Sequence, residues 1–64
     1  MNKDELKSII SGEALTRFGS VLNDEQLEGI VADKSIADYN KANEIDMNAI
    51  LERVREILIE KGII

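Results

Sequence analysis

The last third of the chain carries a complete helix signal, which constrains the fold more than any other feature of the sequence. Asp46 is a good N-cap, while Lys61 and Gly62 have the charge and the backbone freedom that suit a helix end. Between these positions, apolar residues recur at the spacing of one helix face: Met47, Ile50, Leu51, Val54, Ile57 and Leu58. Because the start, the stripe and the stop agree, we predict a long C-terminal helix over this segment.

Two apolar pairs are expected to fasten the ends of this helix. Ile45 and Ile50 hold the positions of a hydrophobic staple around the N-cap. Ile63 and Leu58 hold the two positions whose contact accompanies a Schellman ending. The sequence therefore predicts defined local structure at both ends of the helix.

A second helix start is predicted at Asn23. Asn23 is followed three residues later by Gln26, which is a capping-box pattern, and Leu22 and Leu27 are placed to form a hydrophobic staple around it. We expect this helix to end near residues 33–34. Its inward-facing residues would be Leu27, Ile30 and Val31.

The N-terminal third allows two predictions. Ser11 and Gly12 interrupt an apolar stripe, which favours one helix that starts near Lys3 and a second helix from Glu13 to about Val21. These two helices would bury Leu6, Ile9, Ile10, Ala14, Leu15, Phe18 and Leu22. Five apolar residues are spaced by four across the interruption, so one long helix kinked at Gly12 is the alternative.

Residues 35–43 predict a short helix or an ordered turn, because Ser35 with Asp38 resembles another cap. The core side of this segment would hold Ile36, Tyr39 and Ala42. Together the elements predict an all-α fold, a small compact bundle of three to five short helices. A chain of 64 residues has room for one such domain, over residues 1–64.

The residue types that are missing exclude several kinds of chemistry. The chain has no cysteine and no histidine, so it has no disulfide, no thiolate zinc site, no Cys–His nucleophile and no Ser–His–Asp triad. A domain of this size also offers little room for a substrate pocket. We therefore expect no enzyme and no cofactor, and we expect helix packing or oligomerisation to stabilise the fold.

The charge of the chain disfavours anionic partners. Thirteen acids against eight bases give a formal net charge of −5, and the bases are scattered. Binding to nucleic acid or to anionic lipid needs clustered Lys and Arg. No apolar run approaches the length of a membrane span, and the first residues turn acidic without a hydrophobic signal core. We therefore expect a soluble cytoplasmic protein with no membrane partner.

A calcium loop is the one metal site that the sequence allows us to test. A loop of the EF-hand type needs oxygen ligands at positions 1, 3 and 5, a glycine at position 6 and an acid at position 12. Counting from Asp38, Asn40 fits position 3, but Ala42, Asn43 and Ala49 stand at positions 5, 6 and 12. We therefore predict no metal site.

Residues 45–64 allow an alternative function. A helix that ends in Lys61-Gly62 and two further isoleucines resembles the recognition helix of winged-helix proteins. The resemblance implies a helix-turn-helix nucleic-acid binder that uses Arg53 and Arg55. Three glutamates on the same helix oppose DNA phosphates, which makes nucleic acid the weaker prediction. A further alternative is an acidic inhibitor from a mobile element that mimics DNA for a basic target.

The preferred prediction comes from an excess of apolar residues at the C-terminus. Three consecutive apolar residues at 57–59 cannot all lie on one helix face, and two isoleucines follow the helix end. We therefore expect a non-enzymatic protein-interaction module, a small regulator or accessory factor that binds a protein partner or a second copy of itself through a helix face. Its predicted apolar anchors are Val54, Ile57, Leu58, Ile59, Ile63 and Ile64, with Glu52, Glu56 and Glu60 as a polar rim.

Overall fold

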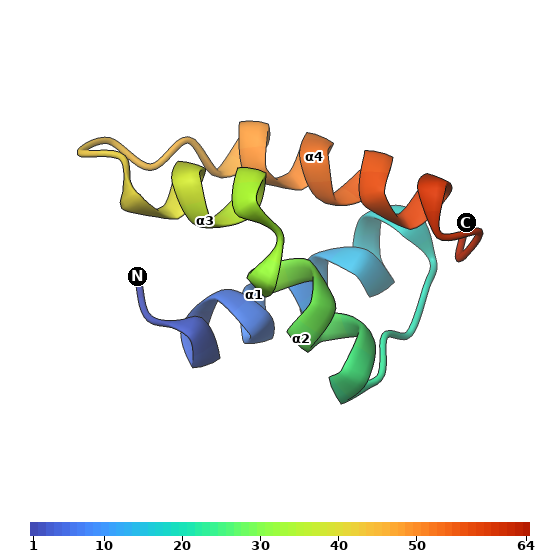
Figure 1. The fold of residues 1–64 in the computed structure, drawn as a ribbon. Helices are drawn as coiled ribbons and strands as arrows, with labels where there is room; N and C mark the ends of the chain where they lie inside the picture. Colours follow the sequence, from blue (N-terminus) through green and yellow to red (C-terminus); the bar gives the residue numbers. More distant parts are fainter.

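The computed structural model describes all 64 residues and contains four helices and no strand (Figure 1). The helices are α1 (Lys3–Phe18), α2 (Asp24–Ala32), α3 (Lys34–Lys41) and α4 (Met47–Glu60). The all-α fold and the helix number agree with the sequence-based prediction. α1 has 16 residues and α4 has 14, so the N-terminal helix is the longer of the two.

Each helix packs against two others. α1 contacts α2, α2 contacts α3, α3 contacts α4, and α4 returns to contact α1. The side chains inside this ring form the core, and all of them are apolar. The buried residues are Leu6, Ile10, Ala14, Leu22, Leu27, Ile30, Val31, Ile36, Ile50, Leu51, Val54, Ile57 and Leu58.

The predicted break at Ser11 and Gly12 is wrong, because α1 continues through both residues. Leu6, Ile10 and Ala14 are four residues apart and are all buried on one face of α1. Burial along this continuous face outweighs the cost of one glycine in a helix, which is about 1 kcal/mol. The alternative of one helix that continues through Gly12 is therefore the correct one.

α1 ends at Phe18, three residues before the predicted end. Gly19 adopts a left-handed backbone with a φ of 65°, and the amides of Gly19 and Ser20 both donate to the carbonyl of Ala14. Leu15 was expected in the core, but 57% of its surface is exposed. Its position is about 100° around the helix from Ala14, which takes it off the buried stripe.

The predicted capping box at the start of α2 is confirmed in full. The amide of Gln26 donates to Asn23 Oδ1 at 2.8 Å, and the amide of Asn23 donates to Gln26 Oε1 at 2.9 Å. Leu22 and Leu27, the predicted staple pair, are both buried in the core. The local sequence therefore determines where this helix begins.

α3 is a helix with a different cap from the one predicted. Asp33, not Ser35, is the N-cap, and it accepts a hydrogen bond from the amide of Ser35 at 3.0 Å. Ile36 is buried as expected, whereas Tyr39 is 41% exposed and Ala42 is exposed. The expectation for these last two residues was wrong because Ala42 is already the extended C-cap of a short helix that buries only Ile36.

The caps at both ends of α4 have the predicted geometry, while Ile45 of the predicted staple is 37% exposed. Asp46 accepts hydrogen bonds from the amides of Asn48 at 3.1 Å and Ala49 at 3.3 Å. At the other end, Gly62 is left-handed with a φ of 74°, and the amide of Ile63 donates to the Leu58 carbonyl at 2.9 Å. This is the Schellman pattern, and it turns Ile63 back onto the core.

Candidate interaction surface

The structure divides the six predicted apolar anchors into two groups. Val54, Ile57 and Leu58 are at most 2% exposed, because they are the part of α4 that fills the core. A partner cannot reach these three side chains, so the prediction that they bind one is corrected. The chain uses the regular stripe of α4 for its own folding.

The remaining three predicted anchors stay near the surface at the C-terminal end of α4. Ile59 is 48% exposed and Ile64 is 42% exposed, while Ile63 is partly buried against the core. Ile59 is exposed because it stands one position beyond Leu58 on the helix, about 100° away from the buried stripe. Ile59 and Ile64 are therefore apolar residues that the core does not bury.

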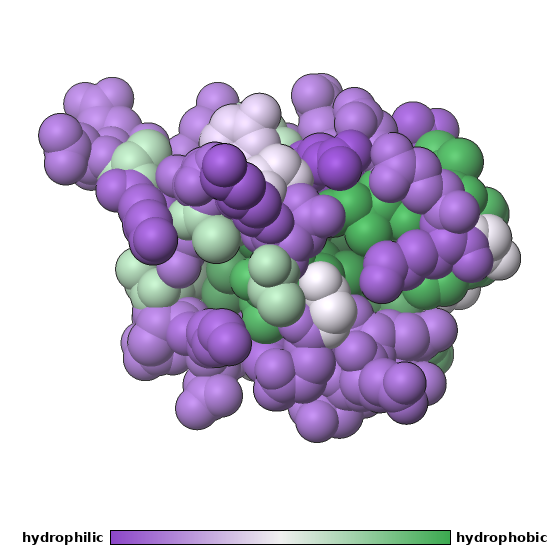
Figure 2. Space-filling model, viewed as in Figure 1, coloured by the Kyte–Doolittle hydropathy of each residue, from purple (hydrophilic) through white to green (hydrophobic).

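Two further apolar residues are exposed at the same end of the molecule. The C-terminal ends of α1 and α4 and the α1–α2 loop lie together there, opposite the α3–α4 loop (Figure 1). Leu15 is 57% exposed near the end of α1, and Val21 is 81% exposed in the loop. Hydrophobic side chains gather at this end of the surface (Figure 2). We call this surface the apolar end; its members are Leu15, Val21, Ile59, Ile63 and Ile64.

Sequence reasoning missed Leu15 and Val21 as surface residues. A usable signal was present for Val21, since Gly19 is a typical helix-ending residue and places Val21 outside the helix. Leu15 was missed because the break assumed at Gly12 left the direction of the α1 core stripe undefined.

The predicted polar rim is partly neutralised by Arg53. Its guanidinium lies 3.1 Å from Glu56 Oε2 and 3.5 Å from Glu60 Oε1. The hydrogen bond to Glu56, with the charges of Glu60 and Asp33, raises the pKa of Arg53. Glu52, the third predicted rim residue, has no ion pair, and neither has the neighbouring Arg55.

Arg53 also joins α4 to the start of α3. Its Nε donates to Ser35 Oγ at 2.8 Å, and the Ser35 hydroxyl in turn donates to Asp33. The hydrogen bond from Ser35 lowers the pKa of the Asp33 carboxyl, and the charge of Arg53 adds to this effect. The three side chains form one polar link between α3 and α4. The Arg53 guanidinium therefore already has partners within the chain.

Lys7 makes a second polar link that the sequence did not indicate. Its Nζ lies 2.6 Å from Glu28 Oε1 and 3.0 Å from Asp24 Oδ1, which ties α1 to α2. The two hydrogen-bonded carboxylates, that of Glu28 above all, raise the pKa of Lys7 above its ordinary value. No local pattern predicts this link, because its members are far apart in the sequence.

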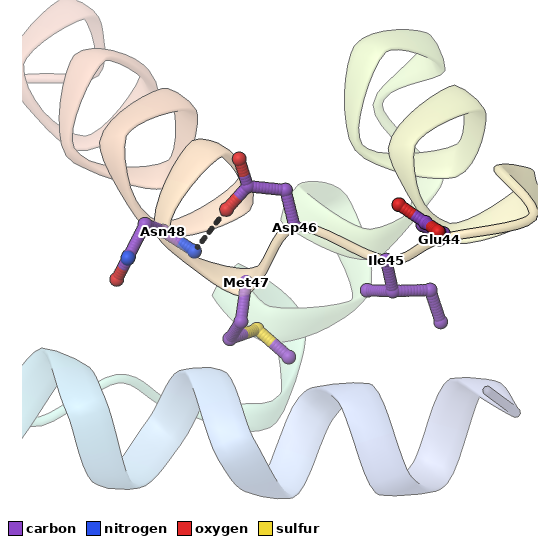
Figure 3. Close-up of a pocket in the computed structure, with 5 residues that line it drawn as sticks. All are labelled: Glu44, Ile45, Asp46, Met47 and Asn48. Atoms are coloured by element: carbon purple, nitrogen blue, oxygen red, sulfur yellow. Dashed lines mark hydrogen bonds between the residues drawn. The ribbon is translucent and has the colours of Figure 1, made fainter.

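A shallow hollow lies at the opposite end of the molecule, where the α3–α4 loop meets α4 (Figure 3). The residues that line it are Glu44, Ile45, Asp46, Met47 and Asn48. The Asp46 carboxylate is turned toward the amide of Asn48, which it caps (Figure 3). No group of three acidic, histidine or cysteine side chains could hold a metal ion anywhere in the structure. The hollow therefore offers neither a ligand set nor a free carboxylate pair.

Comparisons of the chain with protein-family models, with curated proteins and with solved structures gave no match. None of the four helices combines the length and the apolar character that a membrane span requires. The surface and its chemistry are therefore the basis for a functional proposal.

Proposed function

We propose that the chain is a small protein-interaction module that binds its partner through the apolar end. The observation that carries this proposal is the exposure of Ile59 and Ile64 beside the half-buried Ile63, at a point where the core is already complete. Leu15 and Val21 enlarge the same end. A regulator or accessory factor that acts by contact needs such a surface and no catalytic group.

The grouping of these residues supports the proposal more than their number does. Single exposed apolar residues are ordinary on a small protein. Several of them at one end of the molecule are more typical of a binding surface than the same number scattered over it. Full burial of a leucine or isoleucine side chain is worth about 1.5–3 kcal/mol, so covering the half-exposed Ile59 would contribute about 1 kcal/mol.

The alternatives find less support. A helix-turn-helix binder would need Arg53 for DNA phosphates, yet Arg53 is held by Ser35, Glu56 and Glu60. An acidic mimic of DNA would present uninterrupted rows of carboxylates, whereas Lys7 and Arg53 stand among the acids of α2 and α4 and pair with four of them. The interaction module is therefore the proposal that we carry forward.

Affinity capture with matched variants tests the proposal. Tagged wild-type chain, Ile59→Glu and Ile45→Glu would be used as baits in a lysate of the source cell, with quantitative mass spectrometry. Ile45 is the control because it is 37% exposed and lies at the opposite end of the molecule. We expect a partner that the wild type and Ile45→Glu retain and that Ile59→Glu loses at least about tenfold, which corresponds to about 1.4 kcal/mol. Equal recovery by all three baits would refute the apolar end as the binding surface.

A further inference from the structure

We propose that the apolar end binds the apolar end of a second copy of this chain, which gives a two-fold symmetric homodimer. This inference rests on the proposed function and names the partner. It comes from the distribution of charge around the five apolar residues.

The ends of α1 and α4 that form most of the apolar end carry balanced charges, although the chain as a whole carries a net charge of −5. Residues 52–61 contain three acids and three bases, and in α1 Glu13 and Arg17 pair at 2.6 Å. The excess acid lies in the α2 segment, which begins three residues after Val21, and in the α3–α4 loop: Asp24, Glu25, Glu28, Asp33, Glu44 and Asp46. The parts of α1 and α4 at the apolar end therefore oppose a second copy less than these acidic segments would.

The rim of the apolar end is also self-complementary. Glu52 is an anion without an ion pair, and Arg55 and Lys61 are cations without one. A two-fold interface brings a surface against the same surface of the partner, so a rim that holds unpaired charges of both signs can pair reciprocally. A purely basic partner would leave Arg55 and Lys61 unmatched, and a purely acidic partner would leave Glu52 unmatched.

The position of the acidic loop favours the same arrangement. The α3–α4 loop, with Glu44 and Asp46, lies at the opposite end of the molecule from the C-terminus (Figure 1). Two copies that meet at their apolar ends hold these loops far apart. Contact through any acidic surface would instead bring like charges together, which opposes association.

The size of the surface sets the expected strength of the dimer. A standard interface buries about 800 Å² of each partner, which is about a fifth of the 4111 Å² that this chain exposes. The five apolar side chains, one of which is already half-buried, provide a smaller area than a standard interface buries. We therefore expect a reversible dimer with a dissociation constant on the order of tens of micromolar.

Sedimentation equilibrium measures this association directly. The wild-type mass is expected to rise from 7.1 kDa toward twice that value as the concentration increases from about 5 to about 500 µM. Ile59→Glu should weaken the dimer at least about tenfold, while Ile45→Glu should leave it unchanged. A wild-type mass of 7.1 kDa at the highest concentration, or equal weakening by both variants, would overturn the inference.

Engineered cysteines locate the contact, because the chain has no cysteine of its own. A disulfide forms only where the two Cα atoms come within about 7 Å. In a two-fold dimer a cysteine meets its own copy only near the axis, so under mild oxidation at least one of Leu15→Cys, Val21→Cys, Ile59→Cys and Ile64→Cys should give a covalent dimer in high yield, whereas Ile45→Cys should give only the yield of random collisions. Equal yields from both ends would contradict the predicted contact.

Dimer formation and binding of another protein can be distinguished by combining these experiments. A monomeric chain whose Ile59→Glu variant still loses a different protein in the capture experiment would overturn the homodimer and leave the proposed function in place. A monomeric chain whose Ile59→Glu variant loses nothing would overturn both.

Discussion

Lys7 Nζ lies 2.6 Å from Glu28 Oε1, and the contact joins α1 to α2 through two residues that are 21 positions apart in the sequence. The same ammonium group lies 3.0 Å from Asp24, so one cation serves two carboxylates on α2. The side chain of Lys7 is only 15% exposed. The apolar contacts of the core are non-directional, so this link helps to set how α1 is oriented relative to α2.

Replacing Lys7 tests this link. Lys7→Met keeps the length of the side chain and removes the charge, which leaves two neighbouring carboxylates on α2 to repel each other. We expect a lower Tm by circular dichroism, and a smaller difference from wild type at high salt, because salt screens the exposed carboxylates. Lys3→Met is the control, since Lys3 is exposed and has no ion pair. A Tm loss that Lys3→Met reproduces would show that the link has no specific effect.

The capping box of α2 gives a prediction with a known magnitude. Asn23→Ala removes the side-chain oxygen that accepts from the amide of Gln26. We expect the free energy of unfolding in urea to fall by about 1 kcal/mol. The matched control is Asn43→Ala in the α3–α4 loop, because the exposed Asn43 side chain makes no hydrogen bond, with an expected change within about 0.5 kcal/mol. Equal effects at both positions would contradict the role of the cap.

Two glycines should respond to alanine with opposite signs. Gly62 is left-handed with a φ of 74°, so Gly62→Ala strains the end of α4 and should destabilise the chain by about 1 kcal/mol. Gly12 lies within α1 with open space around it, so Gly12→Ala should stabilise by about 0.5–1 kcal/mol. Urea denaturation measures both changes. Destabilisation by Gly12→Ala would contradict a continuous α1.

The polar link between α3 and α4 predicts a specific pH dependence. The pKa of Asp33 is lowered in the folded chain, mainly by the hydrogen bond from Ser35. Its contribution to stability is therefore complete above its unfolded pKa of about 4 and is lost as the pH falls through the lower folded value. Asp33→Asn keeps a good N-cap but removes the charge. We expect its Tm to be below that of wild type at pH 7 and equal to it in strong acid.

Asp38→Asn is the matched control for this pH profile. Asp38 is an exposed acid on the same helix and makes no ion pair. A profile for Asp33→Asn that parallels that of Asp38→Asn would show that the link to Ser35 and Arg53 contributes nothing specific.

Local sequence predicted most of the helix ends and the part of α4 that enters the core. The caps at Asn23, Asp46 and Gly62 depend on hydrogen bonds between residues a few positions apart, so their patterns are visible in the sequence. The five buried residues of α4 likewise follow from helical periodicity alone. These features need no knowledge of how the helices pack.

The continuity of α1, the exposure of two apolar residues and the two polar links depend on tertiary packing. Whether α1 breaks at Gly12 depends on whether a continuous face can be buried, and Leu15 and Tyr39 face solvent because their neighbours do not reach them. The links through Lys7 and Arg53 join residues that are distant in the sequence. The apolar end was predicted only in part, because periodicity separates Ile57 from Ile59 but no local pattern shows that Leu15 and Val21 lie at the same end of the molecule.

A dilution series of ¹H–¹⁵N correlation spectra tests the central claim most directly, because it reports on each residue of the unmodified chain. If two copies meet at the apolar end, the amide signals of Leu15, Val21, Ile59, Ile63 and Ile64 will move with concentration between about 5 and about 500 µM, while those of Glu44 and Ile45 stay in place. Signals that remain fixed throughout the series, or shifts that centre on the α3–α4 loop, would contradict the account.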